Sequence, residues 1–168
     1  LSREAHESSN RIGPQEADVH LACDVLVGAE DYTLSLSSAS TTLTVVSTSQ
    51  TPTGAMVWDP GVDWPDQGAL LNRIRSRSAR IHEFDALGIA ESLFGRSTEA
   101  NLLLVGAAYQ AGGFDLSAAA IERAIVLNGV AVEANIAAFR WGRVIVDQPS
   151  LVPGLVRDKP ADTGSPVT

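Results

Sequence analysis

Apolar residues follow strand-like spacing in three stretches of the first half of the chain. Residues 18–27 are mostly apolar and close at Gly28, which predicts a strand buried on both faces. Periodicity alone leaves open that part of this stretch begins a helix. Residues 42–48 are β-branched and apolar and predict the clearest strand, and residues 80–86 predict a third. Helices are predicted between and after these strands, over residues 31–37, 66–79 and 87–94.

The last third of the chain has helical spacing throughout. Residues 101–110 are apolar on nearly all sides, which predicts a buried helix, with Ser97 or Thr98 as its cap. Ser117 is expected to cap the next helix and Gly129 to end it in a left-handed conformation. Residues 132–146 predict a final helix.

Strands that alternate with helices indicate an α/β fold. We predict a Rossmann-like, mainly parallel sheet flanked by helices, with a helical C-terminal run. An incomplete domain of this class is the alternative. The expected organisation is a lead-in segment over residues 1–17, the α/β domain over residues 18–148 and a flexible tail over residues 149–168.

Composition narrows the class of partner. The 168 residues carry a formal charge of −8, which disfavours nucleic acid, and no apolar run approaches the length of a membrane span. The single cysteine excludes an internal disulfide and a cysteine-only metal site. These features predict a cytoplasmic protein without a nucleic-acid or membrane partner and without a metal site.

Most catalytic patterns are absent. The chain has neither a Gly-x-Gly-x-x-Gly turn nor a phosphate-binding P-loop nor a Gly-x-Ser-x-Gly elbow. His20 and Cys23 would point to opposite faces of a shared strand, so ordinary packing is the better interpretation of Cys23. Glu83 and Asp85 would share one face, where a solvated strand end or a helix cap is favoured over acid–base chemistry.

Two groups of residues remain as candidate sites. The loop after the clearest strand contains Thr51, Thr53 and Gly54, and parallel sheets bind ligands outside the carboxyl ends of their strands. A turn made rigid by proline is the alternative. In the helical run, we select three residues as candidates for an interface or an anion contact, with pairing of the arginine to a carboxylate of the same domain as the alternative: Asn128, Asn135 and Arg140.

Four segments carry a resemblance to a known family: residues 17–24, 50–54, 100–106 and 120–142. Together they resemble the gamma (common) domain of 2-oxoacid:ferredoxin oxidoreductases, of the indolepyruvate ferredoxin oxidoreductase type. The order and spacing of residues 120–142 follow that subgroup most specifically. The Gly-rich opening of the family's gamma domain has no counterpart here, so the chain is similar to the C-terminal part of the polypeptide.

The resemblance implies a function for the intact enzyme. It oxidatively decarboxylates an aryl-pyruvate on thiamine diphosphate, passes electrons through iron–sulfur clusters to ferredoxin and releases an acyl-coenzyme A. This chain is then expected to be scaffold, to bind none of these cofactors itself, to be inactive alone and to have the other domains or subunits as partners. The alternative is a stand-alone α/β interaction module or nucleotide-binding module without catalysis.

Overall fold

The computed structural model describes residues 11–49 and 65–155. Within them, three strands form one parallel sheet in the order β1–β2–β3: β1 (Val19–Ala22), β2 (Leu43–Ser47) and β3 (Arg80–Phe84). Leu43 of β2 lies in register with Val19 of β1 and Arg80 of β3. The predicted mainly parallel α/β fold is therefore confirmed.

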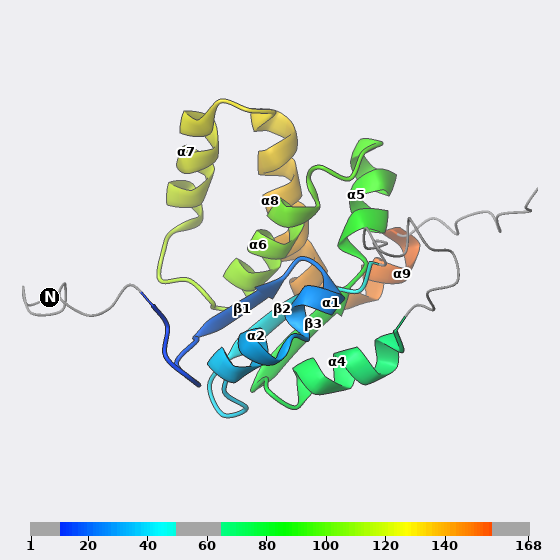
Figure 1. Cartoon of the computed structure of the whole chain (residues 1–168). Coiled ribbons are helices and arrows are strands. Elements are labelled where there is room, and N and C mark those ends of the chain that lie inside the picture. Colours follow the sequence, from blue (N-terminus) through cyan, green and yellow to red (C-terminus); the bar gives the residue numbers. More distant parts are fainter. Residues whose placement is uncertain (1–10, 50–64, 156–168) are drawn as a thin grey trace, which may run out of the picture.

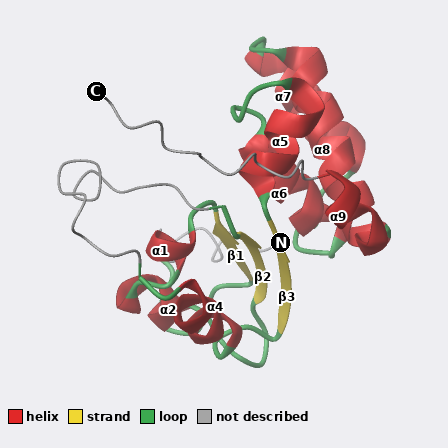
Figure 2. Ribbon diagram, turned by 90° about the vertical axis from the view of Figure 1, so that its right-hand side faces the viewer, coloured by secondary structure: helices red, strands yellow, loops and turns green. Residues whose placement is uncertain are grey.

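Helices cover both faces of this sheet (Figures 1 and 2). One face carries α1 (Val25–Gly28), α2 (Asp31–Leu36) and α4 (Gln67–Arg75), which bury Val46 from the central strand. The other face carries α5 (Ala86–Phe94) and α6 (Ala100–Gln110), which bury Val45. Adjacent residues of β2 thus face opposite cores, which is why this strand is apolar without alternation.

The helical run forms a further layer beyond α6. It comprises α7 (Ala118–Asn128), α8 (Val132–Asp147), the 3₁₀ turn η2 (Pro149–Leu151) and α9 (Val152–Leu155). Because α6 lies between the sheet and α8, it is covered on two sides, as its apolar sequence predicts.

Two glycines let the backbones of α6 and α8 touch. A methyl group on Gly106 would lie 2.0 Å from the carbonyl oxygen of Phe139, and one on Gly142 would lie 2.0 Å from that of Leu103. No side chain fits between these backbones, so glycine is required for close approach at both positions.

Several predicted boundaries are confirmed and others are wrong. Ser117 caps α7 and Gly129 ends it with a φ of 72°. Neither Ser97 nor Thr98 caps α6: Glu99 stands at the cap, and the Thr98 hydroxyl donates to its carboxylate at 2.8 Å.

The predicted strand over residues 18–27 is too long. It ends at Ala22, because the Asp24 carboxylate accepts from the N–H groups of Leu26 (2.7 Å) and Val27 (3.3 Å) and starts α1. Cys23 lies between the two elements and is exposed, so the ordinary packing expected for it is wrong.

The predicted flexible tail begins with ordered structure. Residues 149–155 form η2 and α9, because Pro149 suits the first turn of a helix and Val152 and Leu155 pack against the core.

Candidate functional site

The carboxyl ends of the strands carry a compact polar cluster. The Ser47 and Ser49 hydroxyls lie 2.7 Å apart, and the Ser49 hydroxyl donates to the Asp85 carboxylate at 2.5 Å. Both serines are buried, with 1% and 6% of their surface exposed. This cluster joins the end of β2 to the start of α5 at the edge of the sheet where ligands of parallel α/β domains bind.

The same cluster uses the free N–H groups at the start of α5. The N–H groups of Ala86 and Leu87 donate to the serine hydroxyls at 3.3 and 3.0 Å, and that of Gly88 donates to Asp85 at 2.9 Å. Asp85 is therefore a helix cap, as the favoured sequence interpretation held. The helix start cannot accept a phosphate without displacing these internal bonds.

The other helices that begin at this edge are closed in the same way. Asp24 caps α1, and the Asp66 carboxylate accepts from the N–H groups of Gly68 (2.9 Å) and Ala69 (3.3 Å) at the start of α4. Three carboxylates thus stand at the helix starts where a diphosphate would need positive charge.

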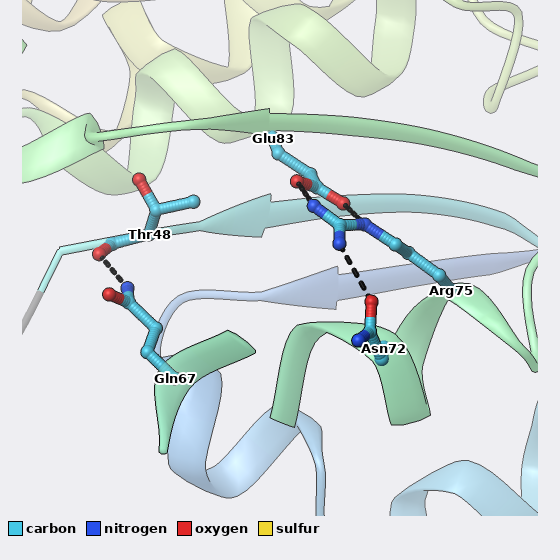
Figure 3. A network of polar contacts seen from close by, with 5 residues as sticks. All are labelled: Thr48, Gln67, Asn72, Arg75 and Glu83. Atoms are coloured by element: carbon cyan, nitrogen blue, oxygen red, sulfur yellow. Dashed lines mark hydrogen bonds and ion pairs between the residues drawn. The ribbon is translucent and has the colours of Figure 1, made fainter. Parts of the chain in front are cut away.

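The candidate loop residues Thr51, Thr53 and Gly54 lie outside the described residues. The chain enters and leaves this loop at the carboxyl edge, where the Gln67 amide donates to the Thr48 carbonyl at 2.6 Å (Figure 3). The loop therefore leaves the carboxyl end of β2, as expected, and the ligand contacts stay a prediction.

Glu83 is engaged by an arginine. The Arg75 guanidinium donates to both of its carboxylate oxygens, at 2.7 and 2.6 Å, and to the Asn72 amide oxygen at 2.9 Å (Figure 3). Hydrogen bonding and charge together raise the pKa of Arg75. Glu83 therefore ties β3 to α4.

Sequence reasoning missed the two serines and the burial of a histidine. His20 is 8% exposed, and its Nδ1 has no hydrogen-bond partner among the described residues. Burial lowers the pKa of His20, and burial followed by the charge of Arg80 lowers that of His82. A histidine inside an apolar strand signals a neutral, buried imidazole.

The three candidates in the helical run occupy separate positions. Arg140 donates to both carboxylate oxygens of Glu122 at 2.8 Å, which matches the alternative that it pairs within the domain. This pairing, led by the hydrogen bond, lowers the pKa of Glu122. The Asn135 amide donates to the Val130 carbonyl at 2.9 Å, and Asn128 is the last residue of α7. The structure does not gather them into one site.

A groove runs along α8 beside Arg140. Its volume is about 560 Å³, and apolar side chains form most of its wall: Ile136, Ala137, Trp141, Val144 and Leu151. Glu133 and Arg140 also line it. The opposite side of α8, which includes Phe139 and Gly142, packs against α6.

The described residues do not fit the cofactors that the resemblance implies. Across residues 11–49 and 65–155, no group of three or more His, Cys, Asp or Glu is placed to hold a metal ion. One exposed cysteine cannot bind an iron–sulfur cluster, and the carboxylate-capped helix starts repel a diphosphate. We therefore derive no catalytic step through these groups in this chain. No helix in the described part of the chain is long and apolar enough to cross a bilayer.

A parallel sheet with helices on both faces defines a Rossmann-like α/β unit. The family model described as pyruvate ferredoxin/flavodoxin oxidoreductase matches residues 1–145, and the chain belongs to that family. The resemblance to 2-oxoacid:ferredoxin oxidoreductases is thereby confirmed at the level of the family. Comparison with curated proteins and with solved structures found no match.

Proposed function

We propose that the chain is the gamma-type scaffold domain of an indolepyruvate-type 2-oxoacid:ferredoxin oxidoreductase. The whole enzyme would decarboxylate an aryl-pyruvate to an acyl-coenzyme A, with ferredoxin as electron acceptor. Thiamine diphosphate and iron–sulfur clusters would be held by other domains or subunits, which are the partners of this chain. The proposed location is the cytoplasm, and the chain alone is expected to be inactive.

One observation carries the scaffold role. Residues 100–106 and the α8 part of residues 120–142 meet in one core, where Gly106 and Gly142 bring α6 against α8. In α6 and α8, the residues that support the resemblance therefore pack the two helices together. The carboxyl edge supports the same role. The N–H groups at the start of α5, which have no partner within the helix, are already hydrogen-bonded to Ser47, Ser49 and Asp85.

The test is reconstitution of the enzyme. The chain would be produced together with the remaining domains or subunits and supplied with thiamine diphosphate and coenzyme A. Reduction of a viologen dye would be followed with indolepyruvate, phenylpyruvate and pyruvate. We expect reduction by the assembly, faster with the aryl substrates, and none by the chain alone.

Each part of the proposal has its own contrary result. Faster reduction with pyruvate contradicts the substrate class, and dye reduction by the isolated chain contradicts the scaffold role. An assembly that is inactive with every 2-oxoacid refutes the function. As a matched pair, Gly142→Ala is expected to lower the yield of active assembly, whereas Gly154→Ala, whose new methyl group meets no atom within 4 Å, is not.

The proposal assigns Thr51, Thr53 and Gly54 to contact with the uncharged pantetheine arm of coenzyme A, since the carboxylates at the helix starts of this edge would repel its diphosphate. Its support is that the loop leaves and returns at the carboxyl edge, beside Thr48 and Gln67. In the assembly, replacing both threonines with alanine is expected to raise KM for coenzyme A and to leave KM for the 2-oxoacid unchanged. Unchanged KM for coenzyme A removes this assignment and leaves the scaffold role untouched.

A further inference from the structure

Helix α7 is the least buried helix of comparable length in the described part of the chain. None of its residues is buried, and large apolar side chains on it and beside it are exposed: Leu116, Val126, Leu127 and Val130, at 44–72% of their surface. It is held by the Glu122–Arg140 ion pair and by a hydrogen bond from the Ala118 N–H to the Tyr109 hydroxyl at 3.1 Å. Figure 1 shows it to one side of α6 and α8. Apolar surface of this kind marks an interface.

The exposed residues of α7 have the spacing of a helix that fits a groove. Arg123, Val126 and Leu127 stand at positions i, i+3 and i+4 of α7 and thus share one side, and the exposed Val130 follows just after the helix ends at Asn128. The α8 groove offers the complementary surface, with Ile136, Trp141 and Val144 in its wall. The same chain therefore carries both an apolar helix face and an apolar groove.

The α7 face and the α8 groove carry side chains of opposite charge. Arg123 lies on the exposed face of α7 and Glu133 lines the groove. Both are exposed, and neither has an ion-pair partner in the described part of the chain. Opposite charges at these two places favour a contact between α7 of one molecule and the groove of another.

The distribution of charge favours a second copy as the occupant. Residues 1–115 carry fifteen acidic and seven basic side chains, which is the whole formal charge of −8. Residues 116–155 carry three of each and are neutral. Two copies that meet through this neutral region avoid direct contact between their acidic parts, which would repel one another.

We propose that two copies of this chain associate symmetrically through α7 and α8. The Arg123, Val126 and Leu127 face of α7 in each copy occupies the α8 groove of the other, and Arg123 of each copy pairs with Glu133 of the other. The arrangement is isologous, so each contact occurs twice. The two α7–α8 pairs then form a four-helix layer.

The test is a charge exchange on the full chain. Sedimentation velocity over a range of concentrations is expected to show a monomer–dimer equilibrium. Arg123→Glu and Glu133→Arg, each alone, place like charges at both contacts and are expected to weaken dimerisation by about tenfold or more. An equimolar mixture of the two variants restores opposite charges at both contacts, and its dimer is expected to recover the affinity of the unaltered chain.

Two control variants separate this contact from a general effect of charge. Arg77→Glu and Glu91→Arg change exposed residues outside α7 and α8 by the same charge and are expected to leave the dimer unaltered. Circular dichroism confirms that each variant is folded. A chain that stays monomeric at all concentrations overturns the proposal. So does a dimer whose affinity is unchanged by either charge substitution, or a mixture of the two variants whose affinity stays as low as that of each variant alone. If the chain is monomeric and the surface is covered only when the other subunits of the proposed enzyme are added, the occupant is a different partner and the proposal is wrong.

Discussion

Replacing Gly142 with alanine tests the contact between α6 and α8 most directly. The new methyl group would lie 2.0 Å from the Leu103 carbonyl oxygen and 2.9 Å from the Ala107 nitrogen, both backbone atoms. Ordinary contact begins at 3.4 Å, so the two helices must separate by about 1.4 Å in that direction. Neither neighbour is the flexible end of a side chain, and the strain cannot be relieved by a rotamer change.

Two opposing terms set the magnitude. Overpacking of a well-packed core costs about 1–3 kcal/mol, and a contact with rigid backbone belongs at the upper end of that range. Alanine regains about 1 kcal/mol over glycine inside a helix. We expect Gly142→Ala to lower the free energy of unfolding by about 2 kcal/mol, or about 4–8 °C in Tm for a chain of this size.

Urea unfolding followed by circular dichroism measures this loss. Gly106→Ala makes the equivalent contact with the Phe139 carbonyl oxygen and is expected to cost a similar amount. The double variant should lose less than the sum, because the first methyl group already separates the helices. Gly154→Ala, in open space on α9, serves as the control. If Gly142→Ala and Gly106→Ala are as stable as the unaltered chain, the backbone contact does not exist as described.

Three further substitutions test the caps and the buried ionisable groups. Asp85→Ala removes the cap of α5 and the acceptor of the Ser49 hydroxyl, and urea unfolding should show a loss of about 1–2 kcal/mol. Burial lowers the pKa of His20 and His82, so below pH about 6.5 the unfolded chain takes up protons that the folded chain does not. The free energy of unfolding should therefore fall between pH 7.5 and 5.5, and less steeply in His20→Gln; an equal slope would contradict the burial of a neutral imidazole. Glu99 is 1% exposed, and its pKa is lowered chiefly by the hydrogen bond from Arg96. The contribution of Glu99 to the free energy of unfolding is therefore present above the ordinary pKa of a glutamate and is lost as the pH falls below that value. Glu99→Gln should flatten the acid limb of thermal melts recorded between pH 6 and 3, and an unchanged limb would remove that role.

The strand–helix alternation of the chain could be predicted from the sequence because local pattern carries it. The β-branched run at residues 42–48 is buried on both faces, and only a central parallel strand meets that condition. Ser117 and Gly129 end α7 through their own backbone and side-chain preferences, without help from distant residues.

The candidate site was less predictable because it depends on which strand ends meet. Ser47, Ser49 and Asp85 are separated by up to 38 residues in the chain, and only the parallel pairing of β2 with β3 brings them together. The ion pair between Arg75 and Glu83 also depends on tertiary structure, because it forms only when α4 packs beside β3. For Arg140, the sequence left a partner surface and a carboxylate of its own domain equally open, and the packing of α7 beside α8 provided Glu122.

The sequence by itself determined the class of fold, most helix ends and the membership of an oxidoreductase family, because these depend on local propensity, on apolar spacing and on the order of residues in matching segments. Only the tertiary structure decided the roles of the polar residues at the carboxyl edge and of the glycines in α6 and α8. The sequence alone does not distinguish a carboxylate that binds a ligand from one that caps a helix. It likewise does not distinguish a glycine in a loop from one packed against another backbone. Partners separated by tens of residues distinguish these cases, and those partners meet only in the folded chain.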